Sequence, residues 1–220
     1  MSIDYVIEIV MSALSALIAL TVHEYCHGYA AYKLGDDTAK SLGRLSLNPL
    51  KHIDLYGAVC MIFFHIGWAK PVPVNSRNFK NPRRDFALTA AAGPASNLIL
   101  GFFTAFLMLL LNSIARNIVF PSEFALNIVI NTRLFLQIFC QINIGLGIFN
   151  LLPIPPFDGS RLLYVFLPPK IYFGIMKYER YIFIGVFVLL FFFGRYLSIV
   201  IALVYNLILN FWQLIPFLRL

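Results

Sequence analysis

Long apolar runs, separated by short polar stretches, account for most of the chain. A helix needs about 20 apolar residues to cross the hydrocarbon core of a bilayer. Several runs reach or approach this length, so the pattern predicts an all-α polytopic membrane protein. About five transmembrane helices are expected, at approximately residues 5–33, 85–112, 132–152, 177–194 and 196–217. The last two should meet in a turn at Gly194-Arg195 and form a C-terminal two-helix segment.

Residues 38–84 break this apolar pattern. Prolines and glycines recur there, and the apolar runs between them are short, as at residues 58–64. Such a run is too short to cross a bilayer as a helix. We therefore expect a small irregular or β-stranded membrane-associated segment at 40–75. Non-helical backbone at membrane depth needs protein or water around it, which would place this segment beside an internal cavity.

Local signals predict where several helices begin and end. Gly35 follows the first apolar run and indicates a C-cap. Ser122 is expected to cap an amphipathic stretch, residues 122–131, that precedes the third span. The third span carries four amides, which should face the interior of the bundle. These amides are Gln137, Gln141, Asn143 and Asn150.

Composition supports a membrane location. Hydrophobic residues make up 60% of the chain and charged residues only 12%, whereas a soluble domain carries about 25% charged residues. The first span is preceded by Asp4 and no basic residue, unlike a secretory signal. We therefore expect this span to be retained, and 1–220 to form a single integral-membrane domain.

The distribution of basic residues predicts an orientation. The net charge is +7, and nine of the seventeen Lys and Arg residues lie between Lys33 and Arg84. Basic loops beside apolar spans stay on the cytoplasmic side. Five spans then place the N-terminus outside and the C-terminus in the cytoplasm. Nucleic acid is not an expected partner, because no surface of interleaved basic and aromatic residues is visible.

The candidate chemistry begins with His23-Glu24-Tyr25-Cys26-His27, at the end of the first apolar run. On a helix, two histidines four residues apart lie on one face. That spacing allows both imidazoles to bind one zinc ion, and the glutamate beside the first can activate a water. The motif therefore predicts a zinc hydrolase site in or at a membrane.

Catalytic zinc sites usually have three protein ligands. The candidates for the third are His52, His65, Asp54 and Asp158. Asp158 is favoured, because it follows a proline-rich break after the amide-rich span and lies on the same predicted side as His27. Taken alone, however, Asp158-Gly159 favours an ordinary turn or helix N-cap before residues 160–167.

Five separated motifs together resemble the site-2 protease family of intramembrane zinc metalloproteases, peptidase family M50. They are His23-Glu24-x-x-His27, GRLSLNPLKHID at 43–54, GWAKPVPVN at 67–75, Gly93-Pro94-x-x-Asn97, and Asn150-x-x-Pro153-x-x-x-x-Asp158-Gly159. The likeness covers roughly residues 15–170. It is closest to the compact members of the family, which have neither a PDZ nor a CBS domain.

The resemblance implies a role for each matching residue. His23, His27 and Asp158 would bind a single zinc ion, and Glu24 would be the general base. Asn150 would contact substrate or the developing oxyanion, or would pack as a helix amide. Gly93, Pro94 and Asn97 would shape the cleft or allow a tight helix crossing. The resemblance assigns no function to His52, His65 or Asp54.

The function implied is an endopeptidase that hydrolyses peptide bonds in or near transmembrane segments of membrane-anchored proteins, as in regulated intramembrane proteolysis. Its catalytic core would lie at about residues 5–170, with the site toward the cytoplasmic half of the bilayer. The 40–75 segment would offer a strand edge to an unwound substrate. The alternative is a non-proteolytic membrane protein that binds or transports divalent metal through the same His/His/Asp cluster.

Overall fold

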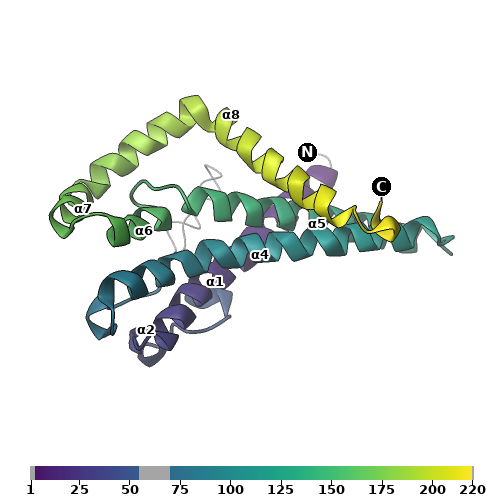
Figure 1. Ribbon diagram of the computed structural model, residues 1–220. Coiled ribbons are helices and arrows are strands. Elements are labelled where there is room, and N and C mark those ends of the chain that lie inside the picture. Colours follow the sequence, from purple (N-terminus) through teal and green to yellow (C-terminus); the bar gives the residue numbers. More distant parts are fainter. Residues whose placement is uncertain (1–2, 55–69, 220) are drawn as a thin grey trace.

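Four long helices form the body of the molecule (Figure 1). They are α1 (Ile3–Lys33), α4 (Pro82–Arg116), α5 (Glu123–Asn150) and α8 (Glu179–Trp212). The structure, a computed structural model, describes residues 3–54 and 70–219. Within these residues it contains no β-strand. The shorter elements are α2 (Thr38–Ser41), α6 (Asp158–Phe166), α7 (Pro169–Met176) and the 3-10 turns η1 (Pro49–Lys51), η2 (Ser76–Asn78) and η3 (Pro216–Leu218).

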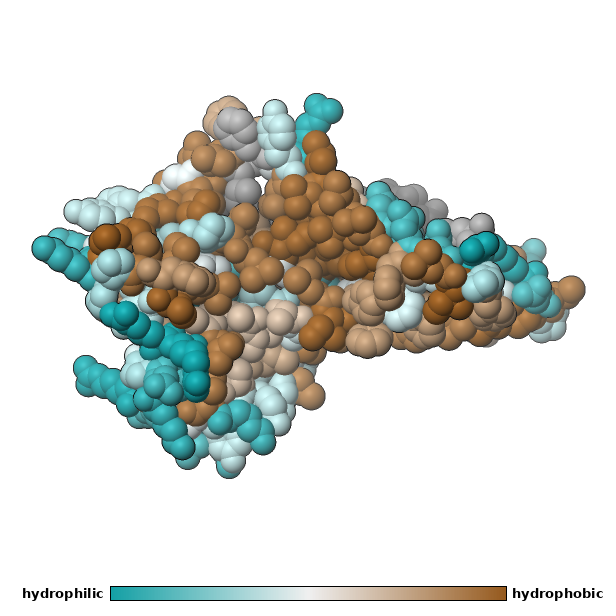
Figure 2. All heavy atoms as spheres, viewed as in Figure 1, coloured by the Kyte–Doolittle hydropathy of each residue, from teal (hydrophilic) through white to brown (hydrophobic). Residues whose placement is uncertain are grey.

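All four long helices contain stretches that can cross a membrane by length and composition. The stretches are Tyr5–Lys33, Pro82–Arg116, Glu123–Asn150 and Gly194–Trp212. Figure 2 shows apolar side chains over the helical body and hydrophilic residues gathered toward its ends. The expected all-α polytopic membrane fold is confirmed.

The number of C-terminal helices differs from the expectation. A single helix, α8, replaces the two spans predicted at 177–194 and 196–217, and the predicted turn at Gly194-Arg195 is helical. A lone glycine costs a helix only about 1 kcal/mol, and no proline follows it to end the helix. Figure 1 shows instead that α8 is one bent helix.

The third long helix starts earlier than expected. Helix α5 begins at Glu123, so the amphipathic stretch at 122–131 belongs to it rather than to a separate connection. The Ala125 N–H donates to Ser122 Oγ (3.2 Å), which makes Ser122 the N-cap as predicted. The described end of α5 is Asn150, two residues before the expected boundary.

The C-terminal end of α1 is closed by a Schellman motif at Gly35. The Gly35 N–H donates to the Tyr32 carbonyl (3.2 Å), and the Asp36 N–H donates to the Ala31 carbonyl (2.9 Å). Gly35 has φ of 107°, a left-handed conformation that glycine adopts at little cost. The predicted C-cap is confirmed, and the turn places Asp36 back against the helix.

The segment expected to be irregular or β-stranded at 40–75 is irregular where it is described. Residues 42–54 and 70–75 contain only the short turn η1 and no strand. The Lys70 N–H donates to the His52 carbonyl (2.8 Å), so the two described parts lie together. The short apolar run at 58–64, His65, and the first residues of the motif at 67–75 lie outside the described residues.

Helix α4 occupies the centre of the fold and packs against α1, α5, α6 and α8 (Figure 1). It runs antiparallel to α1, because His23 contacts Asn97 while the later His27 contacts the earlier Thr89. Its small residues allow the close crossings expected from the sequence. A Cβ atom on Gly101, for example, would lie 2.8 Å from Cγ1 of Ile144 in α5.

Both ends of the described chain lie at the end of the body where α4 finishes (Figure 1). Arg116, the last residue of α4, donates from Nη1 to the Arg219 carbonyl (2.8 Å). Helix α1 starts at the same end, since it runs antiparallel to α4. We expected the termini on opposite sides of a membrane because the sequence predicted five spans. With the single helix α8 in place of two spans, the described residues contain four candidate spans.

Candidate metal centre

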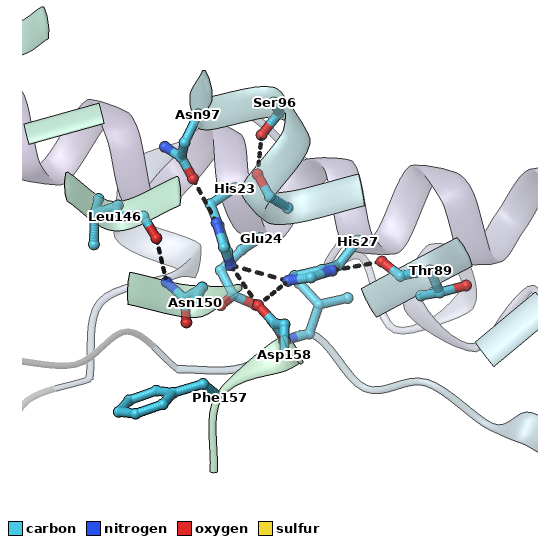
Figure 3. A network of polar contacts seen from close by, with 12 residues as sticks. His23, Glu24, His27, Thr89, Ser96, Asn97, Leu146, Asn150, Phe157 and Asp158 are labelled. Carbon is cyan, nitrogen blue, oxygen red and sulfur yellow. Dashed lines mark hydrogen bonds and ion pairs between the residues drawn. The ribbon is translucent and has the colours of Figure 1, made fainter. Parts of the chain in front are cut away.

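Three side chains that are distant in sequence meet between α1, α4 and α6 (Figure 3). The Nε2 atoms of His23 and His27 are 3.0 Å apart. Oδ2 of Asp158 lies 3.0 Å from His23 Nε2 and 3.1 Å from His27 Nε2. Within the described residues this is the one group of three or more His, Cys, Asp or Glu side chains able to hold a metal ion.

The local sequence accounts for this convergence. His23 and His27 are one helical turn apart on α1, so their rings project from the same face. Asp158 is the first residue of α6, which starts after a break that contains three prolines. Prolines cannot continue a helix, so the chain turns here and brings the start of α6 back to α1. Asp158 is thus the first helical residue and not the N-cap, which is Phe157 and makes no side-chain capping bond. Its carboxylate faces the two histidines instead.

The other ring nitrogens determine the protonation of the histidines. His23 Nδ1 lies 2.5 Å from Asn97 Oδ1, and His27 Nδ1 lies 2.7 Å from the Thr89 carbonyl oxygen. Both partners are acceptors, so each Nδ1 is assigned the hydrogen and donates. Each Nε2 then keeps a free lone pair, and both lone pairs point into the cluster.

Asn97 is held in the orientation that this assignment requires. Its Nδ2 donates to the Ala19 carbonyl (3.2 Å) and to Asn143 Oδ1 (2.9 Å), which leaves its oxygen for His23. Asn143 in turn donates to the Phe139 carbonyl (2.8 Å). Asn97 and Asn143 are fully buried. This amide chain lies behind His23, on the side away from the cluster.

When both rings are neutral, two imidazole lone pairs and a carboxylate oxygen therefore face one another. Acceptors placed this way repel unless a cation lies between them. A tetrahedral zinc ion with bonds of about 2.0–2.1 Å holds its ligand atoms about 3.3 Å apart, close to the separations found here. The donor set therefore fits a zinc ion with three protein ligands and a fourth, open position.

Gly93 leaves the space that the two rings occupy. A Cβ atom at this position would lie 2.3 Å from His27 Nε2 and 2.7 Å from His23 Nε2. No side chain fits there without displacing the rings. Pro94, the next residue, is buried within α4.

Glu24 lies next to the cluster but is not one of its three converging atoms. Its Oε2 accepts a hydrogen bond from the Val72 N–H (2.8 Å). Glu24 also lines a cavity of about 60 Å³ together with His27 and Asp158. The same cavity is lined by Pro71, Val72, Val74, Phe86, Thr89, Ala90 and Arg161. A carboxylate thus faces a space large enough for a few water molecules beside the candidate metal centre.

The remaining candidates lie in different places. Asn150, the last residue of α5, donates from Nδ2 to the Leu146 carbonyl (3.0 Å) and is half-buried near Asp158 (Figure 3). His52 is buried away from the cluster, with Nε2 2.6 Å from the Ser46 carbonyl. Asp54 is not part of the cluster either.

The sequence did not reveal three groups that hold Glu24, His27 and Asn97 in place. The Val72 N–H and the Thr89 carbonyl are main-chain groups, so residue type carries no signal for them. Asn143 was identified only as one of four amides in an apolar helix. A helical period would have placed Asn143, Gly147 and Asn150 on one face of α5, but would not have shown which of them faces Asn97.

Comparison with known proteins identifies the family. The model of "Peptidase family M50" matches residues 11–193. The "Putative zinc metalloprotease YwhC" of Bacillus subtilis (strain 168) is 42% identical over 178 residues, which cover 81% of this chain and 78% of that protein. The "Putative zinc metalloprotease Rip2" of Mycolicibacterium smegmatis is 28% identical over 193 residues, which cover 86% and 69%. No solved structure is significantly similar. The chain belongs to peptidase family M50, the site-2 protease family that its separated motifs resemble.

Proposed function

We propose that this chain is a zinc-dependent intramembrane endopeptidase that cuts membrane-anchored proteins in or near their transmembrane segments. Its family is one of peptidases, and relatives are named as zinc metalloproteases. The observation that carries the proposal is the meeting of the His23, His27 and Asp158 ligand atoms beside the Glu24 carboxylate. Both histidines and Glu24 lie on α1, which is apolar enough to span a bilayer.

In this proposal His23, His27 and Asp158 are the zinc ligands. Zinc bound in such a site would lower the pKa of a water molecule and polarise a substrate carbonyl. Asn97 and the Thr89 carbonyl hold the two rings with Nε2 toward the cluster. The fixed rings keep the ligand atoms in place through the reaction.

Glu24 is the proposed general base. Its carboxylate faces the cavity, where it can accept a proton from the attacking water and return it to the leaving amine. The Val72 N–H holds one of its oxygens, which restricts the rotation of the side chain. Asn150, the last residue of α5, is proposed to orient the substrate peptide or to donate to its developing oxyanion.

The membrane setting supports a membrane-anchored substrate. A transmembrane helix hides its peptide groups in intrahelical hydrogen bonds, so the substrate must unwind a turn before water can attack. A regulatory protein with a single span is the substrate class that we propose, which would make the reaction part of regulated intramembrane proteolysis.

The decisive experiment compares Glu24→Gln with Glu8→Gln, which removes an exposed carboxylate from the same helix. Each purified full-length chain is reconstituted in vesicles with a labelled single-span substrate, and zinc is quantified per chain. Glu24→Gln should lower cleavage by about 100-fold or more, and both variants should retain zinc. Cleavage by Glu24→Gln at the wild-type rate would refute the proposed mechanism. Zinc flux in the same vesicles, without cleavage, would favour the metal-transport alternative.

We further propose an orientation in which the basic end of the molecule faces the cytoplasm. The basic residues of 33–84, together with Arg161 and Lys170, lie at the end where α4 begins. Because both termini lie at the opposite end, each would be outside. Single cysteines at Ser122, between α4 and α5, and at Ser41, the end of α2, would test this orientation. A membrane-impermeant reagent should label them from opposite sides, and equal labelling of both from one side would contradict the orientation.

A further inference from the structure

We propose that Asp36, which touches neither the candidate ligands nor Glu24, is a positioning residue for catalysis. It fixes the segment 70–78, and this segment holds the Val72 N–H on Glu24. The inference rests on the proposed role of Glu24 and adds a residue that the metal centre itself does not identify.

Asp36 anchors the far end of this segment. Its Oδ2 accepts from the Asn75 N–H (2.7 Å), and its Oδ1 accepts from Asn78 Nδ2 (2.7 Å). The side chain is fully buried. Asn75 is the N-cap of the turn η2 and Asn78 is its last residue, so the turn is held near the end of α1.

A carboxylate is required at this position because every group that faces it is a donor. Besides Asn75 and Asn78, the Thr38 N–H (3.1 Å) and hydroxyl (2.5 Å) donate to Oδ1. An asparagine would turn an NH₂ group toward at least one of these donors, which would leave buried donors unpaired. Among the described residues no Lys, Arg or His forms an ion pair with Asp36, so these hydrogen bonds alone compensate its charge.

The segment is tied to α1 at both ends. Glu24 lies within α1 and Asp36 lies in the turn that closes it, and Val72 and Asn75 contact these two residues in turn. Between these points Val72 is buried against α1, where a Cβ on Gly28 would lie 3.1 Å from Val72 Cγ1. A third tie, from Arg44 Nη2 to the Lys70 carbonyl (2.7 Å), holds the other side of Val72.

The short chain between Asn75 and Val72 couples the position of one residue to that of the other. The two prolines beside Val72, Pro71 and Pro73, have fixed φ angles. Fewer backbone rotations are therefore free to absorb a shift at Asn75 before it reaches Val72. Loss of the Asp36 contacts should thus release the Val72 N–H from Glu24 while the zinc ligands stay in place.

A double-mutant cycle tests this directly. The variants are Asp36→Asn, Val72→Pro and their combination, with Asp37→Asn as the matched control, because Asp37 is exposed and its side chain caps nothing. Asp36→Asn alone should lower kcat by about tenfold and retain zinc. Combined with Val72→Pro, which already removes the N–H, it should lower kcat less than about twofold further. Equal effects in both backgrounds would overturn the proposal.

Two further measurements separate positioning from general damage. Combining Asp36→Asn with Asn78→Asp reverses one hydrogen bond and should recover part of the lost kcat. No recovery would count against the anchoring of segment 70–78 by residue 36. Hydrogen exchange of residues 70–78 should accelerate in Asp36→Asn but not in Asp37→Asn. Unchanged exchange in Asp36→Asn would overturn the anchoring. Because exchange does not depend on cleavage, this test stays valid even if Glu24→Gln shows that the proposed function is wrong.

Discussion

The backbone N–H of Val72 donates to Oε2 of Glu24 across 2.8 Å, although the two residues are 48 positions apart in sequence. This bond joins the loop region between α1 and α4 to the proposed general base. It also changes the interpretation of the loop. The sequence suggested a strand edge for an unwound substrate, but the N–H groups of Lys70 and Val72 donate to the protein itself. Pro71 and Pro73, between and after them, have no N–H to offer a substrate.

Val72→Pro and Val74→Pro should therefore behave differently. Val72→Pro removes the donor to Glu24 and should lower kcat by about tenfold with zinc retained. Val74→Pro should lower kcat less, because it keeps the Val72 donor and among the described residues no acceptor contacts the Val74 N–H, although the Val74 side chain lines the cavity. Cleavage assays on both variants decide the point. Equal losses would favour the strand-edge hypothesis, in which both positions contribute donors to the substrate.

Gly93→Ala should weaken metal binding rather than the fold as a whole. The new Cβ would lie 2.3 Å from His27 Nε2 and would displace the ring. We expect a loss of zinc affinity of about 10- to 100-fold, measured as zinc per chain after dialysis against a graded chelator. Gly101→Ala is the control on the same helix. Its Cβ meets Ile144 instead, so it should lower the melting temperature and leave zinc affinity unchanged.

Asn97→Leu should disturb the tautomer of His23. The substitution conserves approximate size but removes the oxygen that accepts from His23 Nδ1. The ring can then place its hydrogen on Nε2, where it opposes metal binding, so zinc affinity should fall by about 10- to 100-fold. Asn143→Leu, which removes only the next acceptor in the chain, should cost less. An equal or larger loss for Asn143→Leu would contradict this order.

Acid should release the 70–78 segment from α1. Burial raises the pKa of Asp36, but hydrogen bonds from Thr38, Asn75 and Asn78 outweigh it, and the net pKa is lowered. An unfolded Asp has a pKa of about 3.9. Ionised Asp36 therefore stabilises the folded state above about pH 4, and this stabilisation is lost as the pH falls through the lower folded value.

Hydrogen-exchange protection of residues 70–78, corrected for intrinsic rates, measures this loss. Protection should be high at about pH 6 and fall below about pH 4 in the wild type. In Asp36→Asn it should be low at both values and change little between them. Protection that is equally high in the wild type at both pH values would show that another group holds the segment.

The sequence alone predicted much of the fold and the core of the site, for identifiable reasons. A bilayer imposes a length and an apolar composition on each span, so the first three long helices were located to within about ten residues. The wrong prediction at Gly194-Arg195 came from a signal that is weak inside an apolar run, where one glycine does not end a helix.

By itself the sequence determined the first three spans and the one-face spacing of His23 and His27, because these depend on residue type and local period. Its separated motifs, through their resemblance to a known family, favoured Asp158 as the third ligand. Only the tertiary structure decided which oxygen orients His23, which carbonyl holds His27, and that a buried Asp36 ties the loop to α1. Those contacts join residues 39 to 74 positions apart, and two of them use main-chain groups, for which residue type carries almost no signal.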